Sequence, residues 1–167
     1  MAYDVAYERL GLSALFDLKG AEAAVRQWLR HPPLQFPRTP NTRSRSRVLE
    51  LWWVGADHWL LRAPLEQEEQ LLDKLSPMEA PEDISVVHVS DTLTFFAITG
   101  PDAEEVLSVT CPLDLASFGE DAVSYTEVFG LKGIVLRRPQ GFEVAVERSF
   151  GDMMLDHFAG VTGHPPT

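Results

Sequence analysis

The stretch TLTFFAITGPDAEEVL, residues 92–107, decides the fold of this chain. Apolar residues stand on both alternating faces of segment 93–98, which predicts a strand that is covered on both sides and lies inside a sheet. Gly100 ends this strand, and Pro101 and Asp102 are typical of the first turn of a helix. The stretch therefore predicts a buried strand that is followed directly by a helix.

The same order of signals also occurs about 80 residues upstream, a spacing too long for a solenoid repeat. The segment SALFDLKGAEAAVRQWLR, residues 13–30, again predicts a strand that ends at a glycine, Gly20, and continues into a helix. In both copies two strands joined by a short turn follow, and then a further helix; these segments are 47–64 and 65–75 in the first copy and 132–147 and 148–158 in the second. The pattern indicates two related halves.

The order β-α-β-β-α, found twice, predicts an α+β fold of two pseudo-duplicated ferredoxin-like halves, with mainly antiparallel sheets and outer helices. We expect the halves at about 12–80 and 84–160. A single domain over 1–167 is expected, because each half is small and has to share its apolar strands with the other. Residues 31–46 hold four prolines and predict an excursion over the surface, and 161–167 predict a frayed end.

Composition argues against several classes of protein. The net charge is −11, from 25 acidic and 14 basic residues, which disfavours binding to a nucleic-acid backbone. A single cysteine excludes a disulfide framework within the chain and a multi-thiolate metal site. No segment approaches the roughly 20 apolar residues that span a bilayer, and the first residues lack the pattern of a signal peptide. We therefore expect a cytoplasmic protein without nucleic-acid or membrane partners.

Charge is unevenly distributed along the chain. Segment 31–47 holds four arginines and no acidic residue, whereas segment 65–83 holds seven acidic residues against Lys74 alone. Both segments are typical of solvated surface. Solvated surface is the favoured interpretation, and the alternative is a docking surface on a larger partner, because charged patches steer and orient association. The residues alone leave both interpretations open.

Reactive residues form no constellation in the sequence. Cys111 has no cation beside it in VTCPLDL, so an inert thiol is expected. Trp52, Trp53 and Trp59 are expected to pack in a core rather than line a stacking pocket for a flat ligand. Phosphate-binding and nucleophile motifs are absent, and the histidines do not stand at metal-ligand spacings: His31, His58, His88, His157 and His164. We therefore expect no catalytic, cofactor-binding or metal residues, and favour a binding or assembly module.

Seven short motifs run in order over about residues 12–159: FDLKG (16–20), FPRTPNT (36–42), LWWVGADHWLL (51–61), VSD (89–91), ITGPDA (98–103), CPLDL (111–115) and ERSF (147–150). Together they resemble the γ subunit of heterotetrameric sarcosine oxidase, over nearly the whole chain. One departure is the turn Gly55-Ala56-Asp57-His58, where the family pattern has glycine-proline-aspartate-glutamate.

The resemblance implies a fold like the first part of the glycine-cleavage aminomethyltransferases (T-protein). It also implies membership of an αβγδ complex that demethylates sarcosine oxidatively to glycine and hydrogen peroxide. With tetrahydrofolate, methylenetetrahydrofolate is a further product. FAD, FMN, NAD, zinc and tetrahydrofolate are implied for the partner subunits, and no cofactor is implied for this chain.

The expected role is a non-catalytic subunit that stabilises the complex, chiefly through the α subunit, with β and δ as further partners. We expect its interface at Phe36, as an apolar anchor, with Arg43, Arg45 and Arg47. Self-association of the isolated chain is a further expectation. One alternative is a stand-alone folate-dependent aminomethyltransferase, although the KGCYxGQE motif is missing here. The other is the equivalent subunit of a complex that acts on another N-methyl amino acid, such as N-methylglutamate.

Overall fold

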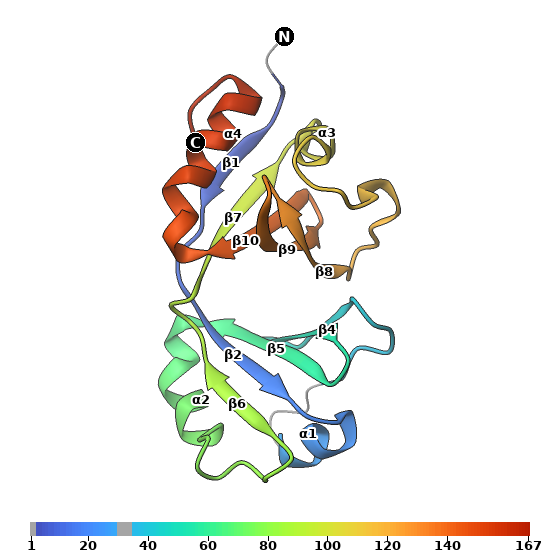
Figure 1. Ribbon diagram of the computed structural model, residues 1–167, viewed down its shortest axis with the longest axis vertical. Helices are drawn as coiled ribbons and strands as arrows, with labels where there is room; N and C mark the ends of the chain where they lie inside the picture. The colour runs from blue at the N-terminus through green and yellow to red at the C-terminus, as the bar shows by residue number, and fades with distance from the viewer. Residues whose placement is uncertain (1–2, 30–34) are drawn as a thin grey trace. The chain divides into compact units, whose positions relative to one another are not determined.

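The computed structural model describes residues 3–29 and 35–167 and divides the chain into two compact units (Figure 1). Unit 2 comprises Leu12–Ser90, and unit 1 comprises Met1–Gly11 together with Asp91–Thr167. Each unit has its own five-stranded antiparallel sheet. The α+β class with antiparallel sheets is therefore confirmed.

Unit 2 has the strand order β3-β4-β5-β2-β6. Its strands are β2 (Ser13–Lys19), β3 (Arg43–Arg45), β4 (Glu50–Gly55), β5 (His58–Pro64) and β6 (Ser85–His88). Its helical segments are α1 (Glu22–Trp28), η1 (Leu65–Gln67) and α2 (Glu68–Lys74).

Unit 1 repeats this arrangement in the order β1-β7-β10-β9-β8. Its strands are β1 (Ala6–Arg9), β7 (Leu93–Thr99), β8 (Val123–Val128), β9 (Leu131–Arg138) and β10 (Gly141–Glu147). Its helical segments are α3 (Ala103–Ser108), η2 (Leu115–Ser117), η3 (Arg148–Phe150) and α4 (Gly151–Thr162).

Matching hydrogen bonds confirm the internal repeat. The glycine that ends the long strand of each unit donates its N–H to the turn of the hairpin that follows. Gly20 donates to the Asp57 carbonyl at 2.9 Å, and Gly100 donates to the Gln140 carbonyl at 3.4 Å. Each glycine thus joins its strand to the neighbouring hairpin in the same way.

The two repeats exchange their edge strands, which the sequence analysis did not predict. β1 stands at the start of the first repeat but pairs with β7 of the second, whereas β6 stands at the start of the second and pairs with β2 of the first. The units therefore begin and end at Leu12 and Ser90 rather than at the expected limits near 80 and 84. Because of this exchange, each unit draws on both repeats.

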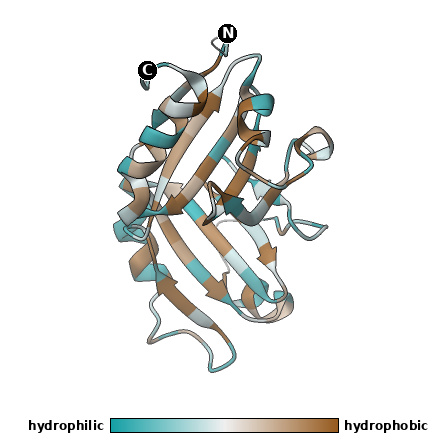
Figure 2. Ribbon diagram, turned by 45° about the horizontal axis from the view of Figure 1, so that its top comes forward, coloured by the Kyte–Doolittle hydropathy of each residue, from teal (hydrophilic) through white to brown (hydrophobic). Residues whose placement is uncertain are grey.

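Each unit has a core between its sheet and its helices. In unit 2, Phe16, Leu18 and Trp59 of the sheet pack with Val25 of α1 and Leu71 of α2. In unit 1 the corresponding cluster is formed by Phe96, Ile98, Phe142, Val106, Met154 and Phe158. Figure 2 shows the strands mainly in hydrophobic colours and polar colours on the outer sides of the helices.

Strand β7 is apolar on both faces, as predicted. Phe96 belongs to the core beneath α4, and Phe95 on the opposite face is buried as well. β7 lies between β1 and β10, so it is an interior strand of its sheet. The stretch that decides the fold is therefore correctly interpreted.

The prediction of a frayed C-terminal end is wrong for the residues that follow α4. The backbone N–H of Thr167 donates to the Tyr7 carbonyl at 3.1 Å, and the Tyr7 hydroxyl donates to the His164 carbonyl at 2.7 Å. Burial raises the pKa of Tyr7 above its usual value. These residues are held because they satisfy the outer edge of β1, which would otherwise expose unpaired backbone groups.

Candidate functional site

Phe36, the expected apolar anchor of an interface, lies in the core of unit 2. It is only 7% exposed, and its ring meets Trp59 edge-on at a centroid distance of 5.1 Å. The guanidinium of Arg26 lies 4.4 Å above the same ring. The excursion expected over 31–46 is therefore partly built into the fold, with β3 as an edge strand. Residues 30–34 of it lie outside the described residues.

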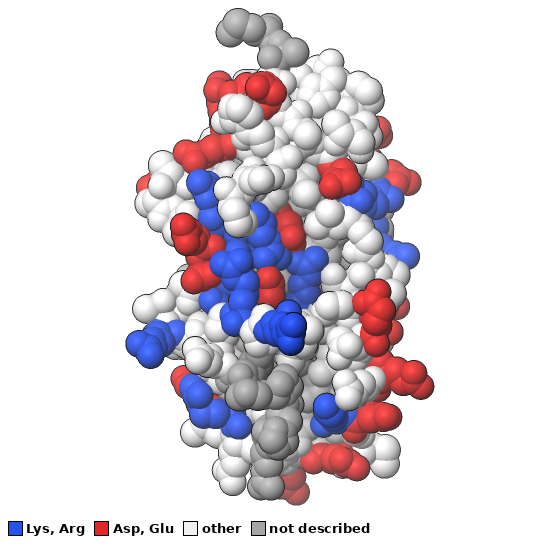
Figure 3. All heavy atoms as spheres, turned by 180° about the vertical axis from the view of Figure 1, so that it is seen from behind, with Lys and Arg blue, Asp and Glu red and all other residues white. Residues whose placement is uncertain are grey.

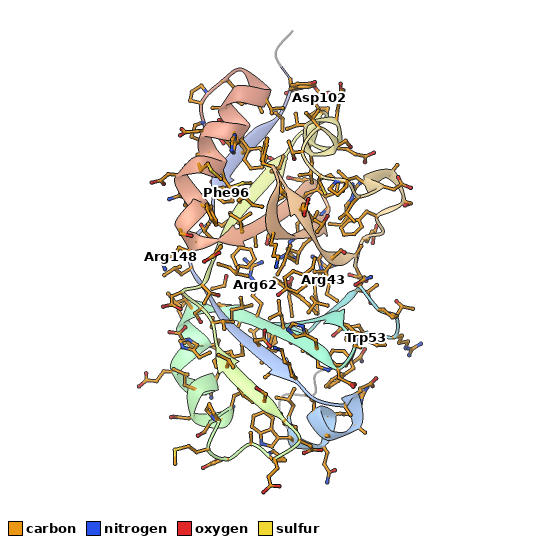
Figure 4. All side chains as sticks on the ribbon, viewed as in Figure 1. Arg43, Trp53, Arg62, Phe96, Asp102 and Arg148 are labelled. Atoms are coloured by element: carbon orange, nitrogen blue, oxygen red, sulfur yellow. The ribbon has the colours of Figure 1, made fainter. Side chains whose placement is uncertain are left out.

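The three arginines expected beside Phe36 differ in their exposure. Arg43 is 3% exposed, whereas Arg45 and Arg47 lie on the surface. Arg43 and Arg62 are on the face of the unit 2 sheet that points away from α1 and α2 (Figure 4). An interface role for this segment is thus still a prediction. Arg45 and Arg47 are the residues of the set that a partner can reach.

A cross-strand polar network occupies that face of the unit 2 sheet. Register places Arg45 opposite Glu50 and Glu50 opposite Arg62, so charges alternate along one row. Glu50 accepts a hydrogen bond from the Trp52 indole N–H at 3.0 Å, and Arg62 donates to the Ser13 hydroxyl at 3.0 Å. Opposite charges on neighbouring strands stabilise a sheet. Arg62 is a residue that spacing along the chain does not indicate, because only strand register brings it beside Glu50.

The acidic segment 65–83 lies along the side of unit 2 that carries α2. Figure 3 shows acidic side chains concentrated on that side of the molecule. Glu66, Glu69 and Asp73 are exposed, as are Glu82 and Asp83 in the loop before β6. The segment therefore presents negative charge to solvent.

Glu68, His88 and Ser90 form a cluster that sequence reasoning missed. His88 Nε2 lies 2.8 Å from Glu68 Oε1 and 2.8 Å from Ser90 Oγ, while the backbone N–H of Leu15 donates to that hydroxyl at 2.9 Å. The hydrogen bonds from Ser90 and His88 hold the pKa of Glu68 below its usual value. A nucleophilic relay needs the hydroxyl and the carboxylate on opposite ring nitrogens. Here both meet Nε2, so the cluster fastens α2 to β6.

A pocket of about 450 Å³ opens in unit 2 at the end of β2. His58 lines it, and His58 Nε2 lies 3.0 Å from Asp17 Oδ2 on the adjacent strand. The other lining side chains are mostly polar and include Lys19, Asp57, Glu82, Asp83 and Ser85. The antiparallel pairing of β2 with β5 creates the His58–Asp17 contact, which spacing along the chain does not indicate. The contact joins β2 and β5 at the edge of the pocket.

Unit 1 has a pocket of about 600 Å³ at the corresponding position, beside Gly100 and the turn that precedes β10. The guanidinium of Arg137 lies 4.6 Å above the ring of Phe142, and its Nη1 lies 3.4 Å from Glu104 Oε2. The positive charge at this pocket is therefore balanced by Glu104. The two pockets follow from the repeated architecture and differ in their side chains.

The remaining sequence candidates lie mostly in packed surroundings. Cys111 is buried, with its sulfur 3.9 Å from the Thr126 hydroxyl oxygen. Trp52 and Trp59 are buried and Trp53 stacks on Trp59 at 5.1 Å, which agrees with the expected core packing. Over residues 3–29 and 35–167, no group of three His, Cys, Asp or Glu side chains is placed to hold a metal ion. His31 lies outside the described residues.

No helix in the described part of the chain has the length and apolar character needed to cross a bilayer. The longest described helix, α4, has 12 residues.

Comparisons with known proteins show what this fold is similar to. A scan against protein-family models finds no match, and a search of curated proteins finds none either. Among solved structures, the chain is similar to a chain of the heterotetrameric sarcosine oxidase from Corynebacterium sp. U-96, with a TM-score of 0.83 and 20% identity. That similarity covers 95% of this chain and 84% of the other.

The chain is also similar to the glycine cleavage system aminomethyltransferase T from Bartonella henselae, with a TM-score of 0.70 and 14% identity. Here the similarity covers 95% of this chain but 46% of the other. At these identities the comparisons show the fold, and the fold expected from the sequence motifs is confirmed.

Proposed function

We propose that this chain is the γ-type subunit of a heterotetrameric sarcosine oxidase and that it supports assembly without an active site of its own. One observation carries the proposal. The similarity to a chain of such an enzyme covers 95% of this chain and 84% of the other, with a TM-score of 0.83. Similarity over nearly all of both chains supports a match between whole subunits. Against the aminomethyltransferase, 46% of the other chain is covered.

The polar clusters within each unit support a structural role. Glu68 and Ser90 share one nitrogen of His88 and tie α2 to the sheet. Arg137 in the unit 1 pocket packs on Phe142 and faces Glu104. These side chains hold helices and strands of each unit together. Such contacts are consistent with a subunit whose role is structural.

The proposal assigns the reaction to partner subunits. The α subunit is the direct contact, with β and δ completing the complex, and the partners bind FAD, FMN, NAD, zinc and tetrahydrofolate. Substrate choice then depends on the flavin-bearing partner. The same chain would therefore serve equally in a complex that oxidises another N-methyl amino acid, and activity with sarcosine or with N-methylglutamate separates the two.

Co-expression with candidate α, β and δ subunits from the same genome tests the proposal. We expect one complex that contains this chain in native mass spectrometry and produces hydrogen peroxide when sarcosine is added. Omitting this chain should prevent assembly or strongly reduce the yield of complex. If the flavoproteins assemble and turn over sarcosine equally well without it, the proposal is wrong.

The second candidate, a stand-alone folate-dependent aminomethyltransferase, is favoured only by the fold shared with the Bartonella henselae enzyme. A folate-dependent transferase would need an aromatic side chain free to stack on a flat pteridine ring, whereas Trp52 and Trp59 are buried in packed surroundings. Calorimetric titration of the isolated chain with tetrahydrofolate distinguishes the candidates. Saturable binding would favour the transferase.

A further inference from the structure

Unit 1 shows how the outer edge of its terminal strand is covered. Its edge strand β1 lies beside α4, and the residues after α4 run along that edge (Figure 1). The N–H and the hydroxyl of Thr167 both donate to the Tyr7 carbonyl, at 3.1 and 3.2 Å. The Tyr7 hydroxyl donates to the His164 carbonyl. Thr167 thus occupies the outward carbonyl of Tyr7, and the bond from the Tyr7 hydroxyl also holds the residues after α4 at this edge.

Strand β6 has the equivalent position in unit 2. Leu10 donates to the Phe95 carbonyl at 2.8 Å in unit 1, and Val89 donates to the Leu15 carbonyl at 2.8 Å in unit 2. Tyr7 stands three residues before Leu10, and Val86 stands three residues before Val89, so Val86 has the position in β6 that Tyr7 has in β1. In the described part of the chain, β6 pairs with β2 alone. The two edge strands therefore start alike. Within residues 3–29 and 35–167 they differ in that Thr167 donates to the outward Tyr7 carbonyl of β1, whereas no backbone–backbone hydrogen bond reaches the outward groups of Val86 and His88.

The antiparallel ladder determines which backbone groups of β6 point outward. Val89 donates to β2, and inward and outward groups alternate along an antiparallel strand. Val87 therefore turns its N–H and C=O toward β2, whereas Val86 and His88 turn theirs away from it. An added strand would find the outward donor and acceptor of the exposed His88, together with those of Val86, which is 7% exposed.

Apolar side chains flank this edge on both faces of the sheet. The Glu68–His88 contact fixes one side of α2 beside β6, and Leu72 lies one turn further along that side. Leu72 and Leu65 are each 39% exposed, and Val87 on the opposite face of the sheet is 50% exposed. We call the outward backbone of Val86 and His88, together with these three side chains, the β6 edge.

Acidic residues are concentrated in the segment that leads from η1 to β6. In the segment from η1 to the start of β6, seven acidic residues stand against one lysine: Glu66, Glu68, Glu69, Asp73, Glu79, Glu82 and Asp83 against Lys74. Complementary charge favours a positively charged partner at such a surface. An open strand edge beside exposed apolar residues is a surface that proteins normally cover.

We propose that the β6 edge binds an extended, basic and apolar segment of a partner subunit, which adds a strand to the unit 2 sheet. Backbone hydrogen bonds form with Val86 and His88. Alternate side chains of the segment pack on Leu65 and Leu72 on one face and on Val87 on the other, while basic side chains meet the acidic surroundings. The inference rests on the proposed function for the existence of a partner subunit, and the contact is one part of a larger interface.

Surface variants of the co-expressed complex test the proposal. The double variant Leu72→Lys/Val87→Lys places positive charge where a basic, apolar segment would pack, and we expect assembly to be at least about tenfold weaker. Val109→Lys is the matched control, because Val109 is 63% exposed and lies in unit 1. A second double variant tests the acidic residues separately from the apolar ones. Glu69→Lys/Asp73→Lys in α2 should weaken assembly, and Glu105→Lys in α3 of unit 1 is its control. Circular dichroism verifies that each variant folds.

Hydrogen exchange on the wild-type complex tests the added strand directly. The amides of Val86 and His88 point outward, so we expect their exchange to slow at least about tenfold in the complex relative to the free chain. The amide of Val87 already faces β2 and serves as an internal reference.

The outcomes separate this inference from the proposed function. If the wild-type chain does not assemble with the flavoproteins, the proposed function fails. If it assembles but the Leu72→Lys/Val87→Lys variant assembles equally and the amides of Val86 and His88 show no added protection, the inference alone is wrong. If protection arises in the free chain with rising concentration, a second copy of this chain is the occupant, and the inference is again overturned.

Discussion

Units 1 and 2 have the same strand order, but different segments of the chain lie at their equivalent edge strands, β1 and β6. In unit 1 the chain after the 12-residue helix α4 returns along β1, whereas in unit 2 the chain after the seven-residue helix α2 forms β6 itself. The repeat therefore produces two units with equivalent sheets. The units differ in the segment that follows the last helix of each one. The two units therefore differ most at the strand edges that follow their last helices.

A second difference lies at the hairpin end of each sheet. Gly141 pairs with Thr99 in unit 1, and His58 pairs with Lys19 at the same place in unit 2. The Ile98 carbonyl comes so close to Gly141 that an added Cβ would lie 2.1 Å from its oxygen, and Gly141 has a φ of 146°. Unit 1 therefore needs glycine where unit 2 carries the histidine of the His58–Asp17 pair.

Substituting the paired positions Gly141 and His58 gives the largest expected contrast. Gly141→Ala should lower the free energy of unfolding by about 3 kcal/mol or more, because the backbone has to shift and the φ is unfavourable. His58→Ala removes the contact with Asp17 and should cost about 1 kcal/mol. Urea unfolding measures both. Equal losses would show that the two hairpin ends are not packed differently.

Each unit buries a large apolar side chain from the segment that precedes its outermost hairpin strand: Phe36 in unit 2 and Leu115 in unit 1. Phe36→Ala should cost about 3 kcal/mol and Leu115→Ala about 2 kcal/mol, because each leaves a cavity in its core. Thermal unfolding of the isolated chain measures the losses. An unchanged stability of Phe36→Ala with impaired assembly would instead support Phe36 as an interface anchor.

Tyr7→Phe tests the covered edge of unit 1. Loss of the hydroxyl bond to the His164 carbonyl should cost about 1 kcal/mol and accelerate exchange of the Thr167 amide. Because burial raises the pKa of Tyr7, the variant should also lose the tyrosine that ionises at unusually high pH in a spectrophotometric titration. Unaltered exchange at Thr167 would show that the backbone bond alone holds the edge.

Glu68→Gln tests the Glu68–His88–Ser90 cluster of unit 2 and should have the smallest effect on stability. The pKa of Glu68 is lowered in the folded state, so its contribution is present at neutral pH and is lost as the pH falls below about 4.5, through the folded-state pKa. Glu68 is partly exposed, so we expect less than about 1 kcal/mol. The difference in unfolding free energy between wild type and variant should shrink from pH 7 to pH 3. A constant difference would contradict this origin.

The repeat and the buried character of β7 could be predicted because they are local. Alternation over 93–98 and the turn at Gly100 depend on neighbouring residues alone, and both correctly indicate the strand and the helix. Strands β1 and β6 were not identified, since each has four residues with mixed polarity. Their exchange depends on pairing across some 70 to 90 residues.

The candidate clusters could not be predicted for a related reason. Glu68, His88 and Ser90 come together because α2 packs against β6, and Asp17 meets His58 because β2 lies antiparallel to β5. Likewise Phe36 stands in a proline-rich, basic segment, yet Trp59 and Arg26 enclose its ring. The composition of a segment predicts only how exposed its residues are on average. Whether one side chain is buried depends on which other side chains pack against it.

The amino-acid order by itself determined the α+β class, the duplication and the separation of basic from acidic segments, since periodicity and charge are properties of short stretches. Tertiary structure alone decided which strands pair at the edges, which aromatic residue is enclosed and which edge the residues after α4 contact. These outcomes arise from contacts between distant segments, where backbone groups must find partners and side chains compete for the same space.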